Sequence, residues 1–319
     1  MFGLDITERR VKILELQERK GTLILQGLGE KELEDINQLP SVLKTIRQNA
    51  KPASITSKEV VLAIPEEESF TKYLHVPLQD KSALPEFIQG EIQKILPYEQ
   101  ADVYWDWKLV EPSAAGILEV MVTAAPRSTV DQYIQQIKDA GCTPALIETE
   151  SNALLWGVAS PFCEEVIKEP TVIVNMGDEK STLVIVTRGT IRFSASLPMN
   201  GIKKAPDYLA LPWDAWIQSN KKNWSLTEKN LLALLEKMRE DLDYYHDHLL
   251  DSPQKEEERV KKVVITGSWA NFPEIVEFIS KKIGMPALKV QPLINVHPAY
   301  TIALGLALRG LYEEQHSGV

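Results

Sequence analysis

The sequence has only two cysteines among 319 residues, Cys142 and Cys163. Two thiols cannot build the disulfide framework that stabilises small secreted domains, and their separation matches no zinc-ligand spacing. We therefore expect buried or incidental thiols in a protein of a reducing compartment.

Long apolar runs are missing as well. No segment reaches the roughly 18–20 consecutive apolar residues that a membrane-spanning helix requires. The N-terminus carries an acid at Asp5 with no apolar stretch behind it, which is not the pattern of a signal peptide. We expect a cytoplasmic protein that does not insert into the membrane, so that any association with the membrane is indirect.

The sequence also has no excess of basic residues. The chain has 35 lysines and arginines against 45 aspartates and glutamates, a net charge of −10 at pH 7. Nucleic-acid binding needs a concentrated basic patch, and the lysine pairs of this chain are scattered, so nucleic acid is excluded as a partner. The 44% hydrophobic and 25% charged residues are typical of a globular protein. The length suggests about two domains.

The sequence does contain a pattern of strands and turns that occurs twice. Apolar strands are expected at 2–6, 11–16 and 22–26, and again at 171–176, 181–186 and 190–194. Each set predicts a three-stranded antiparallel meander with polar turns. The shared design indicates an internal duplication, which rests on topology because the residue identity between the two sets is weak.

The rest of the chain alternates helices and strands. Helices are predicted at 32–49, 82–96, 128–140, 150–159, 225–249, 271–283 and 298–312, and strands at 60–64, 70–76, 103–110, 118–124, 144–148, 263–267 and 287–290. Residues 69–141 form an α+β unit that interrupts the alternation, so we interpret them as an insertion. The tryptophan-rich connection 200–224 is expected to pack against the body or to bind a partner.

Polar residues end the first strand of each meander, at Asp5 and Asn175. Two such turns facing each other can hold a polyphosphate, because hairpin N–H groups donate to phosphate oxygens and a carboxylate can hold Mg²⁺ through water. The first turn, 7–10, lacks the glycine that close approach of a phosphate favours, and its Glu8 would repel phosphate. The second turn keeps Gly177 but is acidic. On these residues alone, nucleotide binding stays open.

Trp105 and Trp107 lie two residues apart on an expected strand, so both indoles point to one face of it. Such a pair either packs into a core or lines a surface for a partner. Both interpretations stay open, and both residues are candidates for partner binding.

Six short motifs follow one another along nearly the whole chain. They are Asp5-Ile6, Ile95-Leu96-Pro97-Tyr98, Thr123-Ala124-Ala125-Pro126-Arg127, Gly141-Cys142-Thr143-Pro144-Ala145-Leu146-Ile147-Glu148, Thr266-Gly267-Ser268 and Ala303-Leu304-Gly305-Leu306-Ala307-Leu308-Arg309. In this order they resemble the PilM family, a group of cytoplasmic, actin-like type IV pilus assembly proteins related to the cell-division protein FtsA.

The resemblance implies a bilobed, actin-like α/β fold with two duplicated ribonuclease H-like cores. Residues 1–65, 143–169 and 297–319 would form subdomain 1A, and residues 66–142 would form the inserted α+β subdomain 1C. Residues 170–199 and 260–296 would form subdomain 2A, with 200–259 as the helical subdomain 2B.

The resemblance also implies a site for ATP and Mg²⁺. Asp5 and Thr7 match the first phosphate loop, Asn175, Gly177 and Asp178 match the second, and Thr266, Gly267 and Ser268 match the adenosine loop. Asp5 would hold Mg²⁺ through water. Glu150 matches the acid that positions the attacking water in active relatives.

Departures from the family pattern weaken this site. Thr7 and Asn175 replace a glycine and an aspartate of the phosphate loops, Ser268 replaces the second glycine of the adenosine loop, and 200–204 lacks the glycine-rich start of subdomain 2B. We therefore expect a scaffold that binds nucleotide poorly or not at all, rather than an enzyme. Glu150 would then be only a polar residue at a helix start.

The function implied is a scaffold of a type IV pilus or type II secretion inner-membrane platform, in contact with other platform proteins. Its partner would be the cytoplasmic N-terminal peptide of a PilN-type membrane protein, docked between 1A and 1C through backbone pairing and apolar pockets. The alternative is an ATPase of the same machine whose nucleotide state changes subdomain closure. An FtsA-like membrane tether is disfavoured, because the tail 312–319 lacks a basic amphipathic helix.

Overall fold

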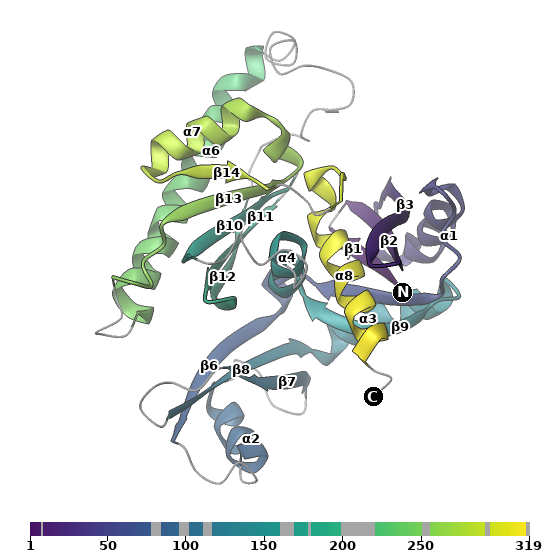
Figure 1. The fold of residues 1–319 in the computed structure, drawn as a ribbon, viewed down its shortest axis with the longest axis horizontal. Coiled ribbons are helices and arrows are strands. Elements are labelled where there is room, and N and C mark those ends of the chain that lie inside the picture. Colours follow the sequence, from purple (N-terminus) through teal and green to yellow (C-terminus); the bar gives the residue numbers. More distant parts are fainter. Residues whose placement is uncertain are drawn as a thin grey trace.

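The computed structural model describes residues 1–7, 9–77, 84–95, 102–110, 117–159, 169–177, 180–198, 221–250, 256–290 and 294–316. The strands of these residues form three sheets (Figure 1). We call the six-stranded sheet with its helices the first lobe, on the right of Figure 1, and the five-stranded sheet with its helices the second lobe, at upper left. The three-stranded sheet with its helix, residues 70–126, is the inserted module and lies below them.

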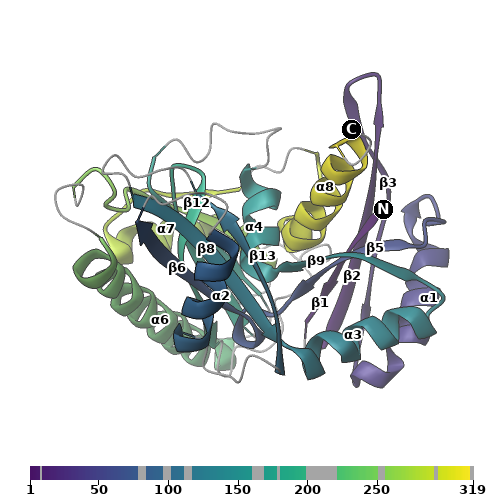
Figure 2. The ribbon, with the colours of Figure 1, turned by 90° about the horizontal axis from the view of Figure 1, so that it is seen from below.

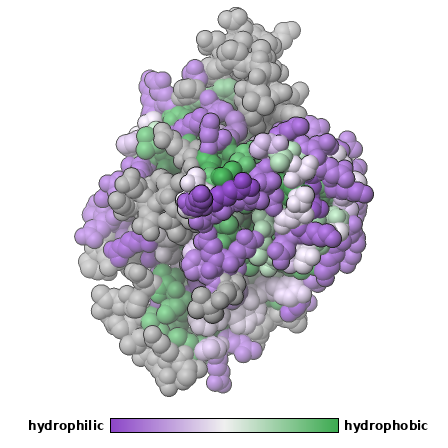
Figure 3. Space-filling model, turned by 45° about the vertical axis from the view of Figure 1, so that its right-hand side comes forward, coloured by the Kyte–Doolittle hydropathy of each residue, from purple (hydrophilic) through white to green (hydrophobic). Residues whose placement is uncertain are grey.

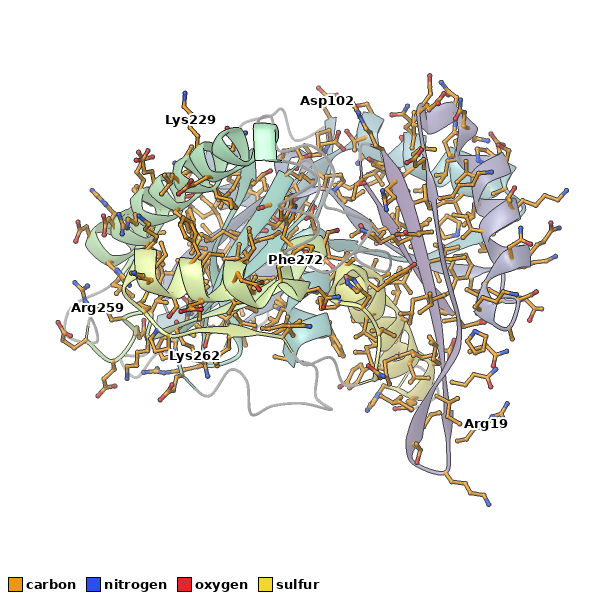
Figure 4. The ribbon with its side chains drawn as sticks, turned by 90° about the horizontal axis from the view of Figure 1, so that it is seen from above. Arg19, Asp102, Lys229, Arg259, Lys262 and Phe272 are labelled. Atoms are coloured by element: carbon orange, nitrogen blue, oxygen red, sulfur yellow. The ribbon has the colours of Figure 1, made fainter. Side chains whose placement is uncertain are left out.

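The first lobe has the strand order β4-β3-β2-β1-β5-β9. Its strands are β1 (Phe2–Ile6), β2 (Arg10–Arg19), β3 (Thr22–Glu32), β4 (Lys51–Pro52), β5 (Glu59–Ile64) and β9 (Thr143–Thr149). The apolar side chains of β1 lie on one face of the sheet, and those of β5 alternate between its two faces. One face packs on α1 (Leu39–Asn49) and α3 (Arg127–Asp139), and the other on α4 (Glu150–Ala159) and α8 (Thr301–His316). The β2–β3 hairpin extends beyond the sheet, with Arg19 near its tip (Figure 4).

β3 is longer than the sequence predicts, and α1 starts correspondingly later than predicted. β3 continues through two glycines, and at these positions α1 and the segment after it pack directly on the strand. A Cβ on Gly29 would lie 2.6 Å from Cγ2 of Ile46, and one on Gly27 would lie 2.4 Å from the carbonyl oxygen of Ala53. Glycine, normally a sign of a turn, here lets a paired strand pass close beneath a helix.

The second lobe has the strand order β12-β11-β10-β13-β14. Its strands are β10 (Thr171–Met176), β11 (Lys180–Thr187), β12 (Thr190–Pro198), β13 (Lys262–Gly267) and β14 (Ala287–Lys289). α6 (Lys221–Tyr244), which continues as a π-helical turn over Tyr245–Leu249, and α7 (Pro273–Ile283) cover one face. α4 and α8 pack on the other face. α6 starts before the predicted residue 225, and β12 ends after the predicted residue 194.

The two large sheets repeat one connectivity. Each begins with an antiparallel meander, β1-β2-β3 or β10-β11-β12, and continues on the side of its first strand through two parallel strands, β5 and β9 or β13 and β14. α4 and α8 lie between the two sheets (Figures 1 and 2). The duplication predicted from the two meanders is therefore confirmed at the level of topology.

The inserted module consists of β6 (Phe70–Pro77), α2 (Leu84–Ile95), β7 (Val103–Leu109) and β8 (Ile117–Pro126), with the sheet order β6-β8-β7. Trp105 and Trp107 share one face, as their spacing predicts, and are partly buried against the core beneath α2. Tyr104 and Lys108 point to the opposite face, where the Tyr104 hydroxyl donates to Asp131 of α3 at 3.1 Å. The face of the module sheet that α2 does not cover is therefore turned toward the first lobe.

Hydrophilic side chains cover most of the face drawn in Figure 3, and hydrophobic ones gather at its centre and toward the bottom. None of the described helices is long and apolar enough to cross a membrane. The predictions made for Cys163 and for most of the connection 200–224 fall outside the described residues.

Candidate functional site

The first predicted phosphate loop is the hairpin between β1 and β2. Asp5 is 5% exposed and faces its register partner Lys12, with Oδ2 of the aspartate 3.7 Å from Nζ of the lysine. The turn closes on itself, because the backbone N–H and the hydroxyl of Thr7 both donate to the carbonyl oxygen of Arg10, at 2.8 and 3.2 Å. Both donors of Thr7 are therefore engaged within the turn. Glu8 lies outside the described residues.

The second predicted phosphate loop joins β10 to β11. Asn175 lies beside Thr182 of β11 and Thr266 of β13 in the sheet register, so the three polar side chains share one face. That face is turned toward the first lobe, since its apolar neighbours pack on α4 and α8. The N–H of Gly177 donates to the carbonyl oxygen of Lys180 at 3.1 Å and closes the hairpin.

The predicted adenosine loop follows β13 directly. Gly267 has a φ of +90°, and a Cβ there would lie 2.7 Å from Oδ1 of Asn175, so this loop contacts the second phosphate loop. Thr266 is fully buried and donates its hydroxyl to a backbone carbonyl oxygen at 3.1 Å. Ser268 is 3% exposed, and Trp269 after it fills the core of the second lobe. The loop is thus packed into the surrounding protein.

Glu150 begins α4 and lies at the centre of a polar cluster that joins the two lobes. Its Oε2 is 2.9 Å from Nζ of Lys180 and accepts the N–H of Glu66 at 3.2 Å, while Oε1 accepts the hydroxyl of Thr182. The same ammonium contacts both carboxylate oxygens of Glu67, at 2.7 and 2.9 Å. The structure therefore places a buried, ion-paired acid where we expected only a polar helix start.

Burial is the first influence on the charges of this cluster. It raises the pKa of the Asp5 carboxyl group. The charge of Lys12 lowers this pKa and the charge of Glu150 raises it, and the net result is a raised pKa. Burial also disfavours the ammonium of Lys180, but Glu150 and Glu67 outweigh it and hold the lysine pKa above its ordinary value. Asp5, Glu150 and Lys180 are thus close enough to influence one another. The sequence-predicted Asp5 and Glu150 lie within electrostatic reach of each other.

Two lysines of the site were not predicted from the sequence. Lys12 could have been found, because the four residues of the turn 7–10 set it opposite Asp5 in an antiparallel pair. Lys180 carries no such signal, since its partners belong to the other lobe and its contacts depend on how the lobes pack.

His297, also not predicted, lies near the adenosine side. Its Nδ1 accepts the N–H of Ala299 at 3.1 Å and caps the short helical turn that leads into α8. Burial, with the nearby charges of Lys289 and Lys12, lowers the pKa of His297 to about 4. The imidazole is therefore neutral at pH 7.

The described residues do not fit a magnesium nucleotide as they stand. Both carboxylate oxygens of Glu150 are engaged by protein groups, the carboxylate of Asp5 is paired with Lys12, and Asn175 brings no charge for a metal. Among the described residues, no group of three or more His, Cys, Asp or Glu side chains is arranged to hold a metal ion. The predicted Asp178 lies outside the described residues.

A second candidate site lies where the inserted module approaches the first lobe. β9 is the last strand of the six-stranded sheet and β7 the last of the module sheet, so each has one side with no strand partner among the described residues. Lys108 on β7 is exposed and lies within electrostatic reach of Glu148 on β9 and Arg309 of α8. Glu148 accepts a hydrogen bond from Arg309 of α8 at 2.9 Å. Leu109 and Ile147 are each 40% exposed and add apolar surface to the two strands.

Comparisons with known proteins extend over nearly the whole chain. A family model described as "Type IV pilus assembly protein PilM" matches residues 3–311. The structure described as "PilM-PilN type IV pilus biogenesis complex" is 18% identical, with a TM-score of 0.76, covering 97% of this chain and 98% of that chain. MreB5 of Spiroplasma citri bound to ADP is 11% identical, with a TM-score of 0.53, covering 99% of this chain and 98% of that chain. These structures share an actin-like fold with this chain.

Proposed function

Because the chain belongs to the PilM family of type IV pilus assembly proteins, we propose that it is a cytoplasmic scaffold of the inner-membrane platform that assembles the pilus. Its partner is the cytoplasmic N-terminal peptide of a PilN-type membrane protein, through which the scaffold reaches the membrane and other platform proteins. We assign residues 1–65, 143–169 and 297–319 to subdomain 1A and residues 66–142 to subdomain 1C. Residues 170–199 and 260–296 would form subdomain 2A, and residues 200–259 subdomain 2B.

The observation that carries the proposal is that β7 and β9 each have an edge without a strand partner in the described part of the chain. An extended peptide can add to a free edge as a further strand, and its backbone hydrogen bonds then supply affinity without a preformed helix groove. Lys108 on β7 and Glu148 on β9 lie within electrostatic reach of each other, so we propose that one peptide contacts both strands. The structure of the complex named for PilM and PilN shares this fold, which supports the choice of partner.

The side chains at these edges favour a peptide of mixed character. Leu109 and Ile147 provide exposed apolar surface for alternate side chains of an added strand. Lys108, Glu148 and Arg309 place charges of both signs beside it. Trp105 and Trp107 lie on the face of β7 opposite Lys108, packed against the module core, and would act through that core rather than by contact with the peptide.

The experiment measures peptide binding with a matched pair of variants. A fluorescent peptide from the N-terminus of the PilN-type protein of the same organism is titrated with the full chain. Ile147→Asp places a charge on the β9 edge and is expected to weaken binding by about tenfold or more. Ile24→Asp is the control, because Ile24 is 39% exposed, against 40% for Ile147, and lies on β3 away from the junction. Absence of binding by the wild-type chain, or equal losses in both variants, would contradict the proposal.

A nucleotide-switched ATPase of the same machine is the second candidate. It is favoured by Asp5, a buried carboxylate at the end of β1 within electrostatic reach of Glu150. It is disfavoured by the pairing of both acids with lysines, which leaves each carboxylate with a cation supplied by the protein. We therefore rank it below the scaffold.

A further inference from the structure

One ammonium group joins the two lobes. Lys180 begins β11 in the second lobe, and its side chain reaches Glu150 at the start of α4 and Glu67 in the short turn after β5. Nζ lies 2.9 Å from Oε2 of Glu150 and 2.7 and 2.9 Å from the two oxygens of Glu67. An ammonium has three N–H donors, so first-lobe carboxylates satisfy all of them.

The strand that carries Lys180 is held in place on both sides of it. The hairpin bond from Gly177 fixes the backbone of Lys180, and two residues further along the hydroxyl of Thr182 donates to the other oxygen of Glu150. Lys180 is 15% exposed and Glu150 7% exposed at their side chains. The Lys180–Glu150 contact is therefore not the kind of exposed surface pair that contributes little to stability, whereas Glu67 is 41% exposed and forms the weaker arm.

The surroundings of Lys180 are rich in acids. The described carboxyl groups of this region are Asp5, Glu66, Glu67, Glu68 and Glu150. Lys12 pairs with Asp5, and among the described residues Lys180 is the cation that contacts Glu67 and Glu150. Removing its charge would leave the carboxylates of Glu67 and Glu150 without a counter-ion from the second lobe.

We propose that Lys180 is an internal clasp, whose ammonium holds the second lobe against the first through Glu150 and Glu67 and keeps the cleft closed with no bound nucleotide. In an actin-like fold with an intact nucleotide site, a ligand between the lobes could supply such a link. In this chain a side chain of the protein supplies it. The inference concerns the fold alone and holds whether or not the peptide partner is correct.

A second polar link limits how far the lobes separate when the clasp is removed. Arg192 of β12 bonds Glu119 of the inserted module at 2.5 Å and lies over the ring of Tyr73, 5.6 Å from its centroid. Loss of Lys180 should therefore loosen the contact near Glu150 without detaching the second lobe. The effect should be local, in the turn that holds Glu67 and in the first turn of α4.

The test compares Lys180→Met with Lys237→Met. Methionine keeps the length of the side chain and removes its charge. Lys237 is the control, because it pairs with Asp241 at 2.9 Å within the single helix α6 and joins no lobes. The readouts are the melting temperature and mass-spectrometric hydrogen exchange of the full chain without nucleotide or peptide.

For Lys180→Met we expect the melting temperature to fall by about 5 °C or more, and exchange to rise by about tenfold or more in peptides covering 66–69 and 150–152. For Lys237→Met we expect a change of at most about 2 °C and no change in those peptides. Equal behaviour of the two variants would overturn the proposal. If Lys180→Met does not fold, Glu67→Gln takes its place, since it removes one arm of the clasp and keeps the lysine. Faster exchange in both peptides then supports the clasp, and exchange equal to that of the wild type overturns it.

Discussion

Gly305 of α8 lies directly against Ala153 of α4: a Cβ on residue 305 would be 1.8 Å from the carbonyl oxygen of Ala153. One α4 turn further, a Cβ on Gly157 would be 2.1 Å from the carbonyl oxygen of Thr301. The two helices therefore pack backbone to backbone between the sheets of the two lobes (Figure 2). Only glycine permits this approach, because any side chain would push the helices apart.

We expect Gly305→Ala to lower the free energy of unfolding by about 3 kcal/mol or more, since the added methyl group can be accommodated only by moving one helix. Urea denaturation followed by circular dichroism measures the change. Gly90→Ala in α2 is the control, because a Cβ at Gly90 meets no atom of the described residues within 4 Å outside its own stretch of helix. Alanine there should stabilise the module by about 0.5–1 kcal/mol. A Gly305→Ala protein as stable as the wild type would show that α4 and α8 do not pack as described.

The sequence predicts the elements of this fold better than their lengths. β1, β10 and α4 have the predicted bounds, because each is a compact apolar run with a polar residue or turn at its ends. β3 and β12 do not, since their later residues are held by pairing with a neighbouring strand rather than by an apolar pattern of their own. Gly27 and Gly29 resemble turn signals, and their role is visible only with α1 in place.

The same limit applies to the candidate site. Asp5, Asn175 and Thr266 lie at strand ends that the sequence identifies, and sheet pairing alone brings Asn175 beside Thr266. What those residues contact cannot be read from strand patterns. The partners of Lys180 come from the first lobe, so its role depends on the packing of the two lobes.

His297 should make stability depend on acid pH. Its pKa is about 4 in the folded chain against 6.5 as the ordinary value, so between these values the unfolded chain binds a proton that the folded chain does not. The stabilisation is complete above about pH 6.5 and is lost as the pH falls toward 4. We expect a loss of about 2 kcal/mol from this residue between pH 7 and pH 4.5.

His297→Asn isolates that loss, because asparagine cannot titrate and its side-chain oxygen can still accept the N–H of Ala299. Unfolding free energies are measured from pH 4.5 to 7.5 for the wild type and the variant. The difference between them should change by about 2 kcal/mol over this range. His316→Asn, at the exposed end of α8, serves as the control. Parallel pH curves for the wild type and His297→Asn would contradict the neutral, buried histidine.

Trp107 should contribute to the stability of the protein and not to its affinity for the peptide. The indole is partly buried against the module core beneath α2, on the face of β7 turned away from the first lobe. Trp107→Ala is expected to cost about 2–3 kcal/mol of unfolding free energy, because part of a large aromatic surface is exposed. Peptide affinity, measured at a temperature where the variant is folded, should stay within about twofold of the wild type. Strong loss of affinity with unchanged stability would instead make Trp107 a contact residue of the partner.

Isothermal titration with ATP and Mg²⁺ tests the nucleotide site itself. We expect no binding at micromolar affinity, because a nucleotide would have to displace Lys180 from Glu150 and Glu67 and would meet a neutral Asn175. Asp5→Ala is the paired variant and should give the same flat titration. Micromolar binding by the wild type that disappears in Asp5→Ala would reverse the ranking of the two functions, since it would show that the cleft opens around Asp5 to admit a ligand. Micromolar binding that survives in Asp5→Ala would place the nucleotide elsewhere on the chain and leave the closed cleft as described.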